Sequence, residues 1–378
     1  RRATAPTDSV LSDDEGGRLA HLYGELQDDI LTSYDRDEPP DLDSGMIDPR
    51  IGTARIGAGP GDVYIAGDLA RAPSRWPLEV ERSTRTEIRS KNLAIQIALD
   101  QSAAWMSDEL SWRIELCGRT AVIPLRLTAL YAHDGDRWVP VFEHLSFGWA
   151  PTVLDAPQSK AIKTEVVTGD LRDELSGVLA RGLFHLPHDP SVVARDPLAL
   201  VLGPDAGDEW HGTHVLEEQL PAGRFEDRRV GLVGRDPASA TVAYWVGNYL
   251  ADVPATPGTA AGKVRMRVTH VFEKRHAQPI GTAPGTAYDG CAPPKDPKDL
   301  KARDRLADCH WVLVQSHMSQ PISDEALTQQ VFGTALASIK PLALDCSDGT
   351  PPATGPAATA PAAAPRRAPD HPPVKQTR

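Results

Sequence analysis

The sequence has few aromatic residues, few cysteines and no long apolar run. Aromatic residues make up 6% of the 378 positions, and the four cysteines form no C-x-x-C pair, which excludes a zinc ribbon or a thioredoxin-like motif. No apolar run approaches the roughly 18 residues of a membrane-spanning helix. Lysine and arginine number 40 against 52 aspartates and glutamates. The resulting net charge of −12 argues against nucleic acid or an anionic membrane as a partner.

Catalytic signature motifs are also missing. The sequence contains no G-x-S-x-G, P-loop or H-E-x-x-H string. Gly57 and Gly59 resemble the start of a dinucleotide-binding loop, but Asp62 stands where its third glycine belongs. His211-x-x-His214 with Glu218 has helical ligand spacing but no fourth ligand. We therefore expect neither a metal nor a cofactor.

Composition divides the chain into two globular regions with polar or low-complexity segments around them. Residues 350–378 contain eight alanines and eight prolines among 29 residues and no aromatic residue, so this tail buries too little apolar surface to fold. We expect a flexible N-terminus at 1–17, a first domain at 18–150, a linker at 151–170, a second domain at 171–345 and a disordered tail at 346–378.

The cysteines leave the compartment open. A Cys291–Cys309 bridge fits an exported protein, whereas unpaired buried thiols fit a cytoplasmic one. The sequence starts at Arg1 rather than Met, which fits removal of an upstream segment. Both a cytoplasmic and an exported location stay open.

The two globular regions share one pattern of residues in one order. The matched positions are a Trp, a His and a Ser near the end, an Arg and a Thr before them, and a Gly-Pro pair with a later Gly upstream. In the first region they are Trp138, His144, Ser146, Arg126, Thr128, Gly59, Pro60 and Gly67. In the second they are Trp311, His317, Ser319, Arg267, Thr269, Gly203, Pro204 and Gly212. The pattern indicates an internal repeat whose second copy carries a loop insertion at 275–306.

Each copy begins with a helical pattern and continues with strand-like runs. Apolar residues recur at helical spacing over 16–34 and 170–184. The expected strands lie at 93–99, 123–131, 138–146, 229–234, 240–250, 263–272 and 311–319. Asp134-Gly-Asp-Arg137 predicts a tight hairpin turn. A helix followed by an antiparallel meander predicts the α+β class.

The last strand of each copy is apolar on both faces. Strict alternation places Trp138, Phe142 and His144 on one face of the first copy's strand. Because both faces need covering, we expect one to pack on helices and the other on the sister copy. The two repeats are therefore predicted to pair with each other within one chain.

The W-x5-H-x-S strand, the R-x-T strand before it and the string DGDRWVPVFEHLS resemble the SnoaL-like branch of the nuclear transport factor 2 superfamily. The resemblance is greatest to the hub domain of calcium/calmodulin-dependent protein kinase II and its bacterial stand-alone relatives. It covers roughly residues 20–150 and 172–335. It implies two tandem cone-shaped α+β barrels, each with helices packed on a curved antiparallel sheet around a pocket, paired as a pseudo-dimer.

The resemblance implies two chemistries for such a pocket. Isomerases and cyclases of the superfamily use a carboxylate base beside a Tyr or Asp donor. Asp108 and Glu143 are the candidate carboxylates, but Asn248 and Ser316 stand at about the sister positions, so no acid/base pair emerges. Hub-like pockets use Arg and His to hold a small carboxylate, which a guanidinium binds in bidentate fashion.

The candidate ligand-binding residues follow the second chemistry. They are Trp105, Arg126, Thr128, His144, Tyr244, Trp245, Arg267, Thr269 and His317. A structural alternative stands beside each: buried histidines bonded to a nearby hydroxyl, arginines solvated or paired on the sheet surface, and aromatic residues in the core.

These observations favour a small-molecule-binding or scaffold protein whose ligand is apolar or bears a carboxylate. The alternative is a cofactor-free isomerase, cyclase or hydrolase that uses acid/base chemistry in one cone. A third hypothesis is purely structural, with both cones filled by side chains. Whether the chain is an enzyme stays open at this point.

Overall fold

The computed structural model describes most of the two globular regions and little else. The described residues are 13–35, 54–59, 61–65, 86–98, 100–116, 119–148, 169–184, 189, 191–194, 199–204, 208–212, 222–233, 240–253, 255, 261–276, 291 and 309–322. The tail expected at 346–378, most of the linker and most of the insertion lie outside these residues. Within them, no helix is both long and apolar enough to cross a membrane.

The first sheet has seven strands in the order β2-β1-β7-β6-β5-β3, with β4 also paired to β5. The strands are β1 (Ala54–Ile56), β2 (Val63–Ile65), β3 (Thr86–Ser90), β4 (Ala94–Ile97), β5 (Ala103–Leu116), β6 (Arg119–His133) and β7 (Trp138–Phe147). Adjacent strands of this sheet run antiparallel, except for β1 and β7, which run parallel to each other.

The second sheet has six strands in the order β10-β11-β12-β13-β8-β9. The strands are β8 (Leu200–Leu202), β9 (Glu209–His211), β10 (Gly223–Val233), β11 (Val242–Val253), β12 (Gly262–His276) and β13 (Cys309–Ser319). Here β8 runs parallel to β13. The expectation of purely antiparallel sheets is therefore wrong: each sheet is mixed, because a short hairpin upstream of the meander adds one parallel strand to its last strand.

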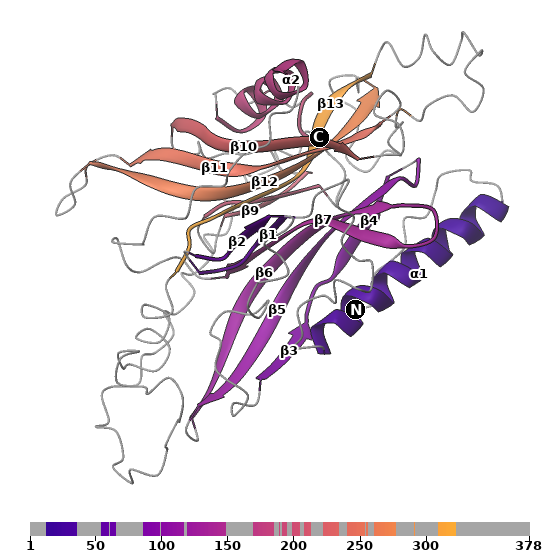
Figure 1. The fold of residues 1–378 in the computed structure, drawn as a ribbon, viewed down its shortest axis with the longest axis horizontal. Helices are drawn as coiled ribbons and strands as arrows, with labels where there is room; N and C mark the ends of the chain where they lie inside the picture. The colour runs from indigo at the N-terminus through magenta and orange to yellow at the C-terminus, as the bar shows by residue number, and fades with distance from the viewer. Residues whose placement is uncertain are drawn as a thin grey trace, which may run out of the picture.

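One helix covers the outer face of each sheet, as Figure 1 shows. The first helix, α1 (Asp13–Asp35), buries Leu22, Leu26 and Ile30 at four-residue spacing against the first sheet. The second, α2 (Gly169–Leu179), continues into a π-helical turn, η3 (Ala180–Phe184), and packs on the second sheet. The helices expected over 16–34 and 170–184 are confirmed, and α1 begins at Asp13, inside the segment expected to be flexible.

The inner faces of the two sheets pack on each other. Their shared core contains Trp105 and Phe142 from the first sheet and Tyr244, Val271 and Val314 from the second. Helix, sheet, sheet and helix thus form four layers, with separate apolar cores under α1 and α2 and a third between the sheets. The candidate residues have to be placed within this layered arrangement.

A β-bulge shifts the last strand of each sheet. The register between β6 and β7 slips at Leu130/Tyr131, which leaves Val141 as the extra residue. The register between β12 and β13 slips in the same way at Val271/Phe272. As a result Trp138 faces α1 and donates to the Leu22 carbonyl at 3.2 Å, whereas His144 faces the other sheet. The strict alternation predicted for this strand is wrong for that reason.

Candidate functional site

Most candidate residues lie in the layer between the sheets. Arg126, Thr128 and His144 project from β6 and β7, and Arg267, Thr269 and His317 project from β12 and β13. Each of these six side chains is buried. Trp105 and Tyr244 belong to the same inter-sheet core, whereas Trp245 packs in the core under α2.

Two histidines stack at the centre of this layer. The imidazoles of His144 and His317 lie 3.8 Å apart between centroids, with an angle of 19° between their planes. Every ring nitrogen bonds to a hydroxyl of the opposite sheet. The four hydrogen bonds join His144 Nδ1 to Thr269 Oγ1 (3.0 Å), His144 Nε2 to Ser319 Oγ (2.7 Å), His317 Nδ1 to Thr128 Oγ1 (2.9 Å) and His317 Nε2 to Ser146 Oγ (2.8 Å). The contacts are reciprocal, because the histidine of each sheet bonds to one threonine and one serine of the other sheet.

Burial keeps both histidines neutral. Desolvation lowers the pKa of His144 well below its ordinary value, and the positive charges of Arg267 and Arg126 lower it further. The pKa of His317 is lowered by burial first, and then by His144 and Arg126. A neutral imidazole donates through one nitrogen and accepts through the other, and a hydroxyl partner can do either, so the four hydrogen bonds are compatible with neutral rings.

Each arginine reaches across to a glycine turn of the other half. Arg126 Nη2 donates to the Gly203 carbonyl at 3.1 Å, and Arg267 donates through Nη1 and Nη2 to the carbonyls of Gly57 and Gly59. Burial lowers the pKa of Arg267 to about 10, so the group stays cationic at neutral pH. Carbonyl oxygens therefore solvate this buried charge in place of water.

Both turns require glycine for a steric reason. A Cβ at Gly57 would lie 2.7 Å from the Cβ of Asp62, and one at Gly203 would lie 2.5 Å from the Cβ of Asp208. In each turn the glycine N–H donates to that aspartate's carbonyl at 2.7 Å. Because Ile56 pairs with His144 as Leu202 pairs with His317, the counterpart of Gly203 is Gly57. The match of Gly59 to Gly203 predicted from the sequence is therefore displaced by two residues. Ligand binding by the candidate residues stays a prediction.

The helix-covered face of the first sheet carries a different polar cluster around Asp108. The Tyr34 hydroxyl donates to Asp108 Oδ2 at 3.1 Å, and the Asn92 N–H donates to Oδ1 at 3.1 Å. Burial raises the pKa of Asp108, although hydrogen bonds from Ser90, Asn92, Tyr34 and Lys91 oppose the rise. A carboxylate of raised pKa beside a phenol is suited to proton transfer or to holding a polar ligand group.

The sequence pointed to Asp108 but not to its partner. Tyr34 lies 74 positions away on α1, outside every motif. The strand register also corrects the sister position: Arg126 pairs with Glu109 and Arg267 with Asn248, so the counterpart of Asp108 is Gly247 rather than Asn248. The second half therefore has no equivalent carboxylate at that point.

Two other helix-facing groups have partners of their own. Glu143 forms an ion pair with Arg55 of the neighbouring strand β1, with 3.4 Å between Oε2 and Nε. In the second half His270 Nδ1 bonds to Ser316 Oγ at 3.0 Å, and burial lowers the pKa of His270 to about 3. The helix-covered faces of the two halves therefore differ: one is acidic and the other holds a neutral histidine.

A cavity of about 60 Å³ opens between the two halves beside β4, β5, β8 and β9. Asp108, Glu109, Arg126, Glu209 and His211 contribute to its lining. This volume holds about two water molecules. Pockets for organic ligands usually measure about 300–1,000 Å³, so the cavity does not accommodate a ligand of that size.

No protein-family model and no curated protein matches the sequence. Among solved structures, the hub homology domain of Chlamydamonas reinhardtii CamKII is 17% identical and covers 36% of this chain and 98% of that one, with a TM-score of 0.23. An Ntf2-like protein involved in plasmid conjugation is 9% identical and covers 58% of this chain and 85% of that one, with a TM-score of 0.16. These scores do not assign the chain to a family.

Proposed function

We propose that the chain is a scaffold or small-molecule-binding protein in which two tandem SnoaL-like, cone-shaped domains pair through their sheets as a pseudo-dimer. The stacked pair of His144 and His317 carries this proposal, because each ring is bonded on both sides by hydroxyls of the opposite half. The arginines and histidines expected to hold a carboxylate are engaged instead in joining the halves.

Energetics favour pairing as the main role of this layer. Each hydrogen bond across this layer contributes about 0.5–1.5 kcal/mol net, because water would replace the lost partner if the sheets separated. Separating the sheets would remove the partners of both imidazoles and both guanidinium groups at once. The sheets would also expose an apolar surface that includes Trp105, Phe142 and Tyr244. A half on its own would therefore need a replacement for the other half.

We place any small ligand on the helix-covered face of the first half, near Asp108 and Tyr34. This follows from the raised pKa of Asp108 and its hydrogen bond to the Tyr34 phenol. The same observation favours the second candidate function, acid/base catalysis in this cone, with Asp108 as the base and Tyr34 as the hydrogen-bond donor.

Native mass spectrometry of the full chain, compared with its denatured mass, tests both parts of the proposal. We expect a monomer, because the partner of each sheet is in the same chain. Any small molecule released on denaturation should be lost in Asp108→Asn and retained in the control Arg113→Ala, which removes an exposed arginine of the same strand. An obligate dimer would contradict internal pairing. A ligand lost in Arg126→Ala but retained in Asp108→Asn would contradict the placement.

A further inference from the structure

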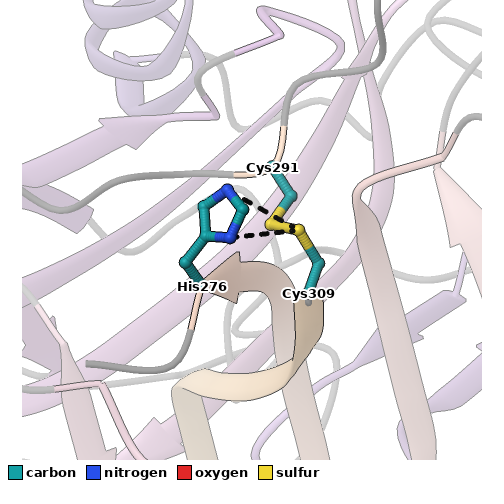
Figure 2. The surroundings of a disulfide bond; sticks show 3 residues. All are labelled: His276, Cys291 and Cys309. Carbon is teal, nitrogen blue, oxygen red and sulfur yellow. Dashed lines mark hydrogen bonds between the residues drawn. A yellow bond between two sulfur atoms is a disulfide. The ribbon is translucent and has the colours of Figure 1, made fainter. Parts of the chain in front are cut away.

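Three side chains that commonly bind metals meet where β12 ends and β13 begins. Cys291 and Cys309 form a disulfide, and the imidazole of His276 lies beside it, as Figure 2 shows. One donor atom from each residue lies within 4.8 Å of the other two. The residues are spread over 276–309 without a compact motif, so the spacing of the cysteines alone does not reveal the cluster.

The backbone brings the three residues together. His276 is the last residue of β12 and pairs directly with Cys309, the first residue of β13. Side chains at directly opposite positions of an antiparallel pair lie on the same face, with Cβ atoms about 4.5–5.5 Å apart. Cys291 is fixed next to them by its N–H, which donates to the Lys274 carbonyl at 3.3 Å. A backbone hydrogen bond and the disulfide therefore both hold Cys291 in place.

We propose that His276, Cys291 and Cys309 form a binding site for Zn²⁺ when the Cys291–Cys309 disulfide is reduced. Two thiolates and one imidazole are ligands that this ion prefers. The proposal does not depend on the scaffold function, because the cluster lies apart from the stacked histidines and from Asp108.

The distances fit a tetrahedral metal site. With Zn–S bonds of about 2.3 Å and Zn–N bonds of about 2.0–2.1 Å, ligand atoms on adjacent corners lie about 3.5–3.8 Å apart. The ring nitrogens of His276 already lie 3.8 and 3.9 Å from Cys309 Sγ. The two sulfurs would have to separate to about 3.8 Å, which reduction of their bond permits.

The site has an open side. Cys291 is buried, whereas Cys309 and His276 are partly exposed. A fourth ligand can therefore approach from solvent, as water does at zinc sites with three protein ligands. The site is accordingly expected to exchange this ligand with small thiols or anions.

Metal and disulfide exclude each other at these sulfurs. Reduction by a dithiol transfers two electrons and two protons to the disulfide, which gives two thiols while the dithiol becomes a disulfide. Zn²⁺ then replaces the two thiol protons, which are released, and also accepts the lone pair of a neutral imidazole. The cluster would thus contain either the Cys291–Cys309 disulfide or a bound Zn²⁺, depending on the redox conditions.

Metal titration of the full chain with the double substitution Cys117→Ser/Cys346→Ser tests the proposal, because only the proposed cysteines remain. Under anaerobic conditions, the reduced protein should take up one equivalent of Zn²⁺ in competition with a chromophoric chelator. Co²⁺ in place of Zn²⁺ should give a thiolate-to-metal charge-transfer band and the visible bands of tetrahedral cobalt. The oxidised protein should show neither.

His276→Ala is the decisive variant, because in the oxidised state it keeps the disulfide and can be checked for folding by circular dichroism. Its reduced form should bind Zn²⁺ at least about 10- to 100-fold more weakly, since even the loss of a residue supporting a ligand weakens metal sites by that factor. The matched control His310→Ala removes the neighbouring histidine, which bonds to the Ser191 carbonyl, and should bind like the parent. Equal affinity in the His276→Ala and parent proteins, or no uptake by the reduced parent, would overturn the proposal.

Discussion

At the scale of single residues, the stacked histidines are the groups most sensitive to their environment. His144, His317 and His270 all have a pKa lowered by burial. The unfolded chain therefore binds more protons than the folded one when the pH falls below about 6.5, the ordinary value for histidine. Folding stability from these groups is complete above that pH and is lost progressively below it.

We expect the free energy of unfolding to fall between pH 7 and pH 5 by up to about 1.4 kcal/mol per pH unit for each titrating histidine. The positive charges of Arg126 and Arg267 lie near His144, and that of Arg126 lies near His317, so they oppose protonation of the two rings. Urea unfolding curves recorded at several pH values measure this slope. A stability that stays constant over this range would contradict the neutral, buried state of the rings.

Asp108 is expected to behave in the opposite way. Its raised pKa means that the folded state favours the protonated form, so its contribution to stability falls as the pH rises through that pKa. Asp108→Asn keeps the shape without the charge and should be as stable as the parent or more stable at pH 7. Tyr34→Phe should cost about 1 kcal/mol, the net value of one hydrogen bond. Thermal unfolding of both variants measures these two effects. A loss of several kcal/mol of stability in Asp108→Asn would contradict the prediction that the folded state favours the protonated carboxyl.

At the scale of elements, the two bulges decide which side chains face which layer. The sequence predicted both helices and most of the long strands, because apolar spacing records local structure, but β5 (Ala103–Leu116) was not among the expected strands. It could not predict that Val141 is an extra residue, since a bulge leaves no period of its own. Trp138 and His144 were therefore placed on one face although they lie on opposite ones. The Tyr34–Asp108 pair was missed for a related reason, because it depends on how the helix lies across the sheet.

Deleting Val141 should remove the bulge and leave Trp138 in the core under α1, because Leu130↔Phe142 and Tyr131↔Pro140 then become consecutive pairs of a regular ladder. We expect a loss of about 0.5–3 kcal/mol, close to that of Val141→Ala, the matched control that removes the same buried methyl groups but keeps the bulge. Tryptophan fluorescence and urea midpoints compare the two. A deletion variant that fails to fold, or whose tryptophan emission shifts to the red, would show that Val141 decides which face Trp138 occupies.

The disulfide joins Cys291, in the middle of the connection between β12 and β13, to Cys309 at the start of β13. It closes a loop with a sequence separation of 18 residues, for which chain entropy predicts a stabilisation of about 3 kcal/mol. Urea midpoints of the Cys117→Ser/Cys346→Ser variant, with and without reductant and in the presence of a chelator, measure this contribution. Identical midpoints would mean that the bridge does not stabilise the fold.

At the scale of the whole molecule, the contacts between the halves should hold without a covalent connection. A protease site inserted into 151–168 allows the chain to be cut after folding. We expect the two fragments to elute together in size-exclusion chromatography, because the inter-sheet core and the histidine network stay intact. His144→Lys should separate the fragments, since it buries a third cation beside Arg126 and Arg267. Val122→Asp, at a position 56% exposed, is the control. Fragments that separate without any substitution would contradict internal pairing.

Having both sheets in one chain frees the two outer faces to evolve apart. In a homodimer a substitution enters both subunits, so a carboxylate gained under one helix appears under the other as well. Here Asp108 stands opposite Leu127 in the first sheet, while the corresponding position of the second is Gly247, opposite Val268. The shared layer keeps its reciprocal contacts, and the partner sheet is present at any dilution because it is tethered. The helix-covered face of one sheet can therefore gain ligand-binding or catalytic residues while that of the other serves only in packing.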